Sequence, residues 1–137
     1  MVKAFDFFQL FFTREMVKSI VLHTNTYAYI HISEGGFKSY TRSDGSWEPT
    51  TSDEIHRLTA LLIFFGLVKV VGDVDKYWST VTLYHGLWAR KIMPRLRFLG
   101  LMAFLHVVDP MNEPAGDKLR KVESFIQYFK TRCQILH

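Results

Sequence analysis

The sequence has little cysteine and none of the short motifs that mark common enzyme sites. Among its 137 residues, Cys133 is the only cysteine, which excludes an internal disulfide and a cysteine-rich zinc module. Metal-protease, serine-hydrolase and P-loop motifs are missing, and the six histidines have no ligand spacing. We therefore expect no catalytic residue, no metal and no cofactor. The single cysteine also fits an intracellular, reducing compartment.

No apolar run is long enough to cross a bilayer. The densest run, Ala60–Val68, lies between Arg57 and Lys69, whereas a membrane helix needs about 20 apolar residues. The apolar N-terminus is interrupted by Asp6, and no small-residue cleavage site follows it, unlike a signal peptide. We expect no association with a membrane.

The composition is that of a globular protein whose charge is unevenly distributed. Hydrophobic residues make up 48% and aromatic residues 15% of the chain, which suits a single domain over residues 1–137. The net charge is −2 over residues 1–75 and +6 over residues 76–137. The C-terminal half is therefore the half expected to meet an anion.

Apolar residues recur at helical spacing, and no strand alternation is found. Thr13 is predicted to cap a helix over about 14–29, and Thr51 with Glu54 forms a capping-box pattern before the next helix. That second helix is predicted to end near Gly72. Because its later half is apolar on nearly all sides, we expect it to be buried centrally.

Turn-rich segments divide the remaining helices. Residues 31–54 are predicted to be a connecting loop and residues 109–117 an inter-helix loop. Two short helices follow residue 72, Pro94 is suited to open a helix to about residue 107, and a last helix starts near residue 117. Cys133 falls on its apolar stripe, as a buried small hydrophobe. The predicted fold is all-α, an irregular bundle of five or six helices.

Four cations occur within eight positions near the middle of the basic half. No acidic residue lies between Asp75 and Asp109. One interpretation is that these cations bind phosphate, to which the helix start at Pro94 adds a partial positive charge. The other is that they form a solvated face, and their spacing fits both interpretations. They are the candidate nucleic-acid-binding residues, Arg90, Lys91, Arg95 and Arg97. We interpret a second basic group on the last helix, Lys118, Arg120, Lys121, Lys130 and Arg132, as a solvated face.

Aromatic and acidic residues near this cluster have two interpretations each. Trp78 has the chemistry to stack on a base, but a wedge between helices is the commoner use of a tryptophan. Asp73 and Asp75 are interpreted as capping a helix start rather than binding a cation, because residues two apart do not share a helix face. The predicted structural anchors are Trp47, Trp78, Trp88 and His106.

The order of several segments resembles the piggyBac transposase family, including the piggyBac transposable element-derived proteins. The similarity extends from about Phe5 to Gln134 and depends on the ordered set rather than on one motif. The segments that carry it are "FDFFQLFFTREMVKSIVLHTNTYA", "EIHRLTALLIFFGLVKV", "KYWST", "MPRLRFLGLMAFLHVVDP" and "DKLRKVESFIQYFK".

The resemblance implies a helical N-terminal part of a dimerisation and DNA-binding domain, in a nuclear protein. In that family an RNase H-like domain with three metal-binding aspartates follows, and a zinc module lies at the far C-terminus. Since the first of these aspartates is expected beyond His137, we expect a truncated, non-catalytic chain with an exposed apolar face.

The implied partners are the DNA phosphate backbone and either a second copy of the chain or a full-length transposase. Two alternatives stay open. The chain is a protein-interaction module for a transposase or another partner, or it is a truncated transposase product without a function.

Overall fold

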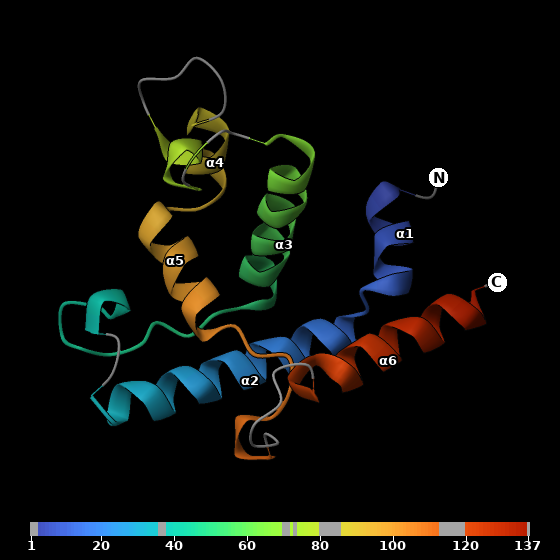
Figure 1. The fold of residues 1–137 in the computed structure, drawn as a ribbon, viewed down its shortest axis with the longest axis horizontal. Coiled ribbons are helices and arrows are strands. Elements are labelled where there is room, and N and C mark those ends of the chain that lie inside the picture. Colours follow the sequence, from blue (N-terminus) through green and yellow to red (C-terminus); the bar gives the residue numbers. More distant parts are fainter. Residues whose placement is uncertain are drawn as a thin grey trace.

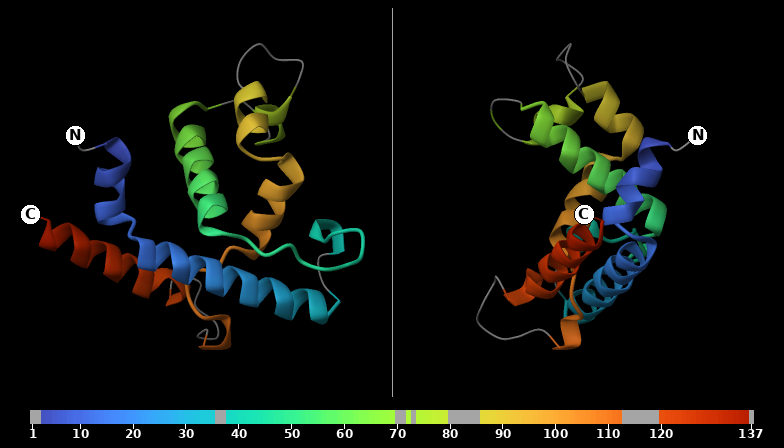
Figure 2. Two further views of the ribbon diagram at one scale, coloured as in Figure 1. Left: turned by 180° about the vertical axis from the view of Figure 1, so that it is seen from behind. Right: turned by 90° about the vertical axis from the view of Figure 1, so that its right-hand side faces the viewer.

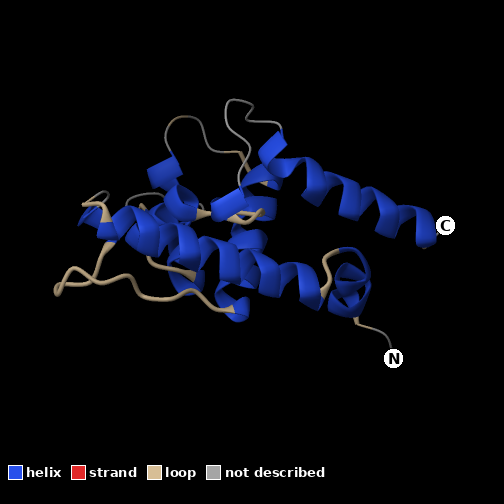
Figure 3. Ribbon diagram, turned by 90° about the horizontal axis from the view of Figure 1, so that it is seen from below, coloured by secondary structure: helices blue, strands red, loops and turns tan. Residues whose placement is uncertain are grey.

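The computed structural model consists of helices and their connections (Figures 1 and 3). It describes residues 3–35, 38–69, 72, 74–79, 86–112 and 120–136, and none of these is in a strand. The predicted all-α fold is therefore confirmed. In chain order the helices are α1 (Ala4–Phe11), α2 (Arg14–Ser33), η1 (Lys38–Tyr40), α3 (Ser52–Leu67), η2 (Val74–Trp78), α4 (Gly86–Ile92), α5 (Arg95–Phe104), η3 (Pro110–Asn112) and α6 (Arg120–Ile135), where η marks a 3₁₀ turn.

The core lies where α3 and α5 pack against the long helix α2 (Figures 1 and 2). Apolar residues of all three helices are buried there, with Trp47 from the connecting segment edge-on to Phe104 at 4.9 Å between ring centroids. Burial of these side chains is the main favourable contribution to folding. The most completely buried apolar side chains are Val17, Ile55, Leu58, Leu61, Leu101 and Phe104.

The helix starts predicted at Thr13 and Thr51 are confirmed. The Thr13 hydroxyl accepts the backbone N–H of Met16 at 3.3 Å, and the Thr51 hydroxyl accepts that of Glu54 at 3.3 Å. Helix α2 continues to Ser33, a turn beyond its predicted end. Of the loop predicted over 31–54, residues 31–33 belong to α2, residues 52–54 belong to α3, and Lys38–Tyr40 form η1.

The prediction that the second half of α3 is buried on all sides is wrong. Ile55, Leu58 and Leu61 are buried, but the chain beyond them is covered on one side only, and Leu67 is 79% exposed. The helix also ends at Leu67 rather than near Gly72. Gly72 lies beyond the helix and has a φ of +105°. The apolar pattern correctly predicted a helix, but it did not show how many other elements pack against that helix.

A second cluster of aromatic rings joins the end of α3 to η2, α4 and α5. Trp78 lies 4.9 Å from Phe98 and 5.7 Å from Phe65 between ring centroids. Its indole N–H donates to the carbonyl oxygen of Met93 at 2.8 Å. Next to it, Pro94 is the residue before α5 rather than its first residue. This cluster fixes the junction between α4 and α5.

Helices α1 and α6 pack against one another at one end of the molecule (Figure 1). Arg132 donates to the carbonyl oxygen of Leu10 at 3.1 Å, and Phe11 and Phe129 are 6.2 Å apart. Cys133 is only partly covered, so its prediction as a buried residue is wrong. The predicted start of the last helix and most of the loop over 109–117 lie outside the described residues.

Candidate nucleic-acid interface

The four cations of the basic cluster are divided between the surface and the interior. Arg90 and Lys91 are exposed in the last turn of α4, and Arg95 is exposed at the start of α5. The Arg97 side chain is only 15% exposed. The structure therefore brings three of the four candidates to the surface, close to the α4–α5 junction.

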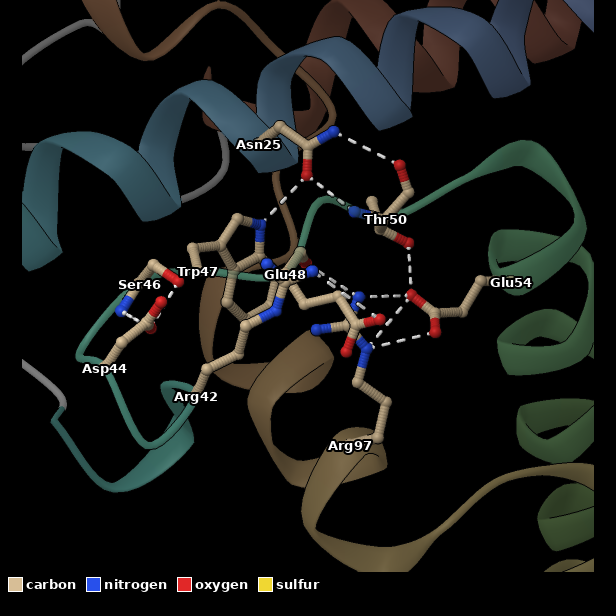
Figure 4. Close-up of polar contacts among 9 residues, drawn as sticks. All are labelled: Asn25, Arg42, Asp44, Ser46, Trp47, Glu48, Thr50, Glu54 and Arg97. Atoms are coloured by element: carbon tan, nitrogen blue, oxygen red, sulfur yellow. Dashed lines mark hydrogen bonds and ion pairs between the residues drawn. The ribbon is translucent and has the colours of Figure 1, made fainter.

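Arg97 is held by partners from two other parts of the chain (Figure 4). Its Nε donates to both carboxylate oxygens of Glu54, at 3.1 and 3.0 Å, and its Nη2 donates to Glu54 Oε1 at 2.6 Å. Nη2 also donates to the carbonyl oxygen of Glu48 at 2.9 Å. The guanidinium carbon lies 4.6 Å from the centre of the Trp47 ring, a cation–π distance. A phosphate would have to displace these contacts to reach Arg97.

Asn25 on α2 completes the same set of contacts (Figure 4). Its side-chain oxygen accepts the indole N–H of Trp47 at 2.9 Å and the backbone N–H of Thr50 at 2.8 Å. Its amide nitrogen donates to the Thr50 carbonyl at 3.2 Å. The Thr50 hydroxyl, which is buried, donates to Glu54 Oε1 at 2.7 Å. We call Asn25, Trp47, Thr50, Glu54 and Arg97 the connector network; it joins the segment before α3 to α2, α3 and α5.

The network also corrects the predicted capping box. The Thr51 hydroxyl caps α3, but the Glu54 carboxylate binds Thr50 and Arg97 instead of reaching back to the backbone of Thr51. Only Trp47 of this network was predicted as an anchor. A capping pattern pointed to Glu54, but nothing in the sequence marked Asn25 or Thr50.

Arg95 forms the second ion pair at this junction. Its Nε and Nη2 donate to the two carboxylate oxygens of Asp75 on η2, each at 2.7 Å. The hydrogen bond from Arg95 lowers the pKa of Asp75 below its ordinary value, and the same bond raises the pKa of Arg95. Asp75 was expected to cap a helix start, but its carboxylate binds Arg95; Asp73 lies outside the described residues.

Arg90 and Arg95 border a hollow in the surface. Its volume is about 580 Å³, and it is open to solvent. Arg90 adds a positive charge to this hollow, whereas the charge of Arg95 is balanced by Asp75. Within the part of the chain that the structure describes, neither Arg90 nor Lys91 pairs with a carboxylate. The hollow is lined by Trp78, Ser79, Arg90, Pro94 and Arg95.

The other predicted anchors occupy different environments. Trp47 and Trp78 are buried, whereas Trp88 is 40% exposed and packs on Phe64 at 4.2 Å. His106 stacks on the ring of Tyr27 at 3.7 Å, and its backbone N–H donates to the Thr24 hydroxyl at 3.1 Å.

The second basic group lies partly outside the described side chains. Lys130 is exposed, as expected for a solvated face, while Arg132 binds the end of α1. In the described ranges, no group of three or more metal-binding side chains is found. None of the described helices is long and apolar enough to cross a bilayer.

Comparison with known proteins defines the class of protein. Residues 3–136 match the family described as Transposase IS4, and the chain belongs to that family. It is also similar to the human PiggyBac transposable element-derived protein 5, with 28% identity over 143 residues, which cover 98% of this chain and 26% of the relative. The chain therefore spans about a quarter of the length of that relative. No solved structure matches. The resemblance predicted from the sequence is confirmed.

Proposed function

We propose that this chain is a DNA-binding part of a transposase-derived protein, acting in the nucleus and without catalysis of its own. It holds duplex DNA by the phosphate backbone through Arg90, Lys91 and Arg95. The observation that carries the proposal is the exposure of these three cations at the α4–α5 junction, two of them on one hollow. Arg97 is assigned instead to holding α5 in place, because its side chain is only 15% exposed and its Nε and Nη2 are bound to Glu54 and Glu48.

Phosphate contacts of this kind give affinity without sequence preference. Each phosphate neutralised releases counterions, so the logarithm of the binding constant falls by about 0.9 per contact for each unit of log salt. Three contacts would give a slope of about −2.7. Binding to any duplex should therefore weaken steeply between about 50 and 200 mM salt.

The test is fluorescence anisotropy of labelled duplexes of two unrelated sequences across a salt series. Arg90→Gln and Lys91→Gln should each weaken binding to both duplexes equally and reduce the slope by about 0.9. Lys18→Gln is the matched control, because Lys18 is an exposed cation on α2, away from the junction. No binding at low salt, or an equal loss from the Lys18 variant, would show that this surface is not the DNA site.

A second candidate function is self-association through α1 and α6. Large apolar side chains are exposed on both helices, as on surfaces that meet another protein. Light scattering over a concentration series tests this, and Phe7→Ser should shift the chain towards the monomer. Leu22→Ser, at an exposed leucine of α2, is the control. A monomer at every concentration would exclude self-association. The exposed residues are Phe5, Phe7, Leu10, Ile126, Tyr128, Phe129, Ile135 and Leu136.

A further inference from the structure

The Asp75–Arg95 pair has the geometry with which arginine binds a phosphate. Two nitrogens of the guanidinium, Nε and Nη2, face two oxygens of one carboxylate at 2.7 Å each. This planar fork fits a phosphate as well as it fits a carboxylate. Asp75 therefore occupies the donors that Arg95 would offer to the backbone of a duplex.

The exposure of this pair makes it exchangeable. The side chains of Arg95 and Asp75 are 43% and 50% exposed, and exposed pairs add little to stability. The pair between Arg97 and Glu54, in the same turn of α5, is 15% and 24% exposed and has further support from Glu48 and Trp47. Arg97 is thus fixed by several contacts, whereas Arg95 is held, among the described residues, by the carboxylate of Asp75.

Asp75 also changes the charge beside the hollow. Arg95 and Arg90 both line the hollow, and η2, which carries Asp75, packs against α4, which carries Arg90. A carboxylate at this place neutralises one of the three exposed cations. Duplex DNA carries a negative charge about every 1.7 Å along its axis. Several phosphates therefore compete with the one carboxylate of Asp75 for Arg95.

We infer that Asp75 takes the place of a phosphate on Arg95 in the DNA-free protein and is displaced when duplex DNA binds. The inference rests on the proposed DNA binding and adds a regulating residue to that surface. Asp75 lowers the affinity for any duplex, because binding must first open its pair with Arg95. Its removal should therefore raise the affinity by releasing Arg95.

Asp75→Asn tests this, since asparagine keeps the size of the side chain and removes its charge. We expect the dissociation constant for a duplex to fall about five-fold at low salt, the upper range for an exposed pair. The salt slope should stay near that of the wild type, because Arg95 contacts a phosphate in both complexes and the variant removes only the cost of opening the pair. Glu34→Gln removes the same charge at the exposed C-cap of α2 and should leave the affinity unchanged.

The double variant Asp75→Asn/Arg95→Gln separates displacement from a general charge effect. If the gain works through Arg95, the double variant should bind no better than Arg95→Gln alone. A gain that persists without Arg95 would mean that Asp75 acts only as a nearby negative charge, and it would overturn the inference.

The Nε–Hε signal of Arg95 in NMR spectra gives an independent readout. In the wild-type chain it should shift when duplex is added, and in Asp75→Asn it should already differ before DNA is present. If the wild-type chain binds DNA with the expected salt slope but Asp75→Asn leaves the affinity unchanged, the inference fails and the proposed function stands. If no variant binds DNA, the proposed function fails and the inference fails with it.

Discussion

The guanidinium of Arg97 on α5 donates hydrogen bonds to the carboxylate of Glu54 on α3, with three nitrogen–oxygen distances between 2.6 and 3.1 Å. Glu54 lies 43 residues earlier in the chain. Two residues away from Arg97, Arg95 makes a similarly short pair with Asp75, but its side chain is 43% exposed. Arg95 and Arg97, which lie in one turn of α5, therefore have different roles. Arg97 holds the fold together, and Arg95 faces the solvent.

Arg97→Ala should therefore destabilise the protein. Removal of one partner of a buried ion pair costs about 3–5 kcal/mol; because this pair is partly exposed, we expect about 2–3 kcal/mol. The free energy of unfolding from urea denaturation measures the loss. Arg90→Ala, at an exposed cation of the preceding helix, should change it by less than about 0.5 kcal/mol. Equal effects of the two variants would contradict the structural role of Arg97.

Asn25→Ala should loosen the segment before α3. It removes three hydrogen bonds and leaves the indole N–H of Trp47 and the backbone N–H of Thr50 without their acceptor. Buried groups left unpaired cost about 1–3 kcal/mol each, so we expect a loss of about 2–4 kcal/mol in unfolding free energy. Thr26→Ala is the control, because it removes one bond within α2 itself. A loss no larger than that of the control would exclude a structural role for Asn25.

What could be predicted from the sequence is what depends on near neighbours in the chain. The caps at Thr13 and Thr51 each bind a backbone N–H three residues on, so the short pattern contains the whole interaction. Helical periodicity is equally local, which is why the all-α class was predictable. The helix starts that follow these caps were predictable as well, whereas the ends of α2 and α3 lie a turn or more from their predicted positions.

What could not be predicted depends on distant partners. The four cations look alike in the sequence, yet Asp75 lies 20 residues from Arg95 and Glu54 lies 43 from Arg97. Helix α3 shows the same limit, because its apolar pattern was compatible with burial on all sides. Only the arrangement of α2, α4 and η2 decides which face is covered.

The Asp75–Arg95 pair should contribute to stability in a pH-dependent way. Its hydrogen bond lowers the folded-state pKa of Asp75 below the ordinary 3.8. The contribution is therefore present above the unfolded-state value and is lost as pH falls through the lowered folded-state value. Melting curves of wild type and Asp75→Asn should differ at pH 7 and converge in strong acid. Arg95→Gln should show the same pattern, because it removes the same pair, and a difference that grows in acid would contradict it.

His56→Phe should stabilise the protein. His56 Nε2 is buried and has no hydrogen-bond partner among the described residues, while the ring makes edge contacts with Phe5 and Phe12 at 5.3 and 6.4 Å. Phenylalanine keeps a ring of similar shape and removes the unpaired nitrogen, which costs about 1–3 kcal/mol when buried. We expect a gain of about 1 kcal/mol, or roughly 3 °C in melting temperature.

His23→Phe is the matched control for this variant, because the Nε2 of His23 lies 3.0 Å from the Ser19 hydroxyl and is already paired. Its replacement removes a bond that is made and should not stabilise the chain. Thermal melts of the two variants at neutral pH measure both effects. If His56→Phe lowered the melting temperature as much as His23→Phe, the imidazole of His56 would have to make a hydrogen bond. In that case α1 and α3 would be held together by that hydrogen bond as well as by their aromatic rings.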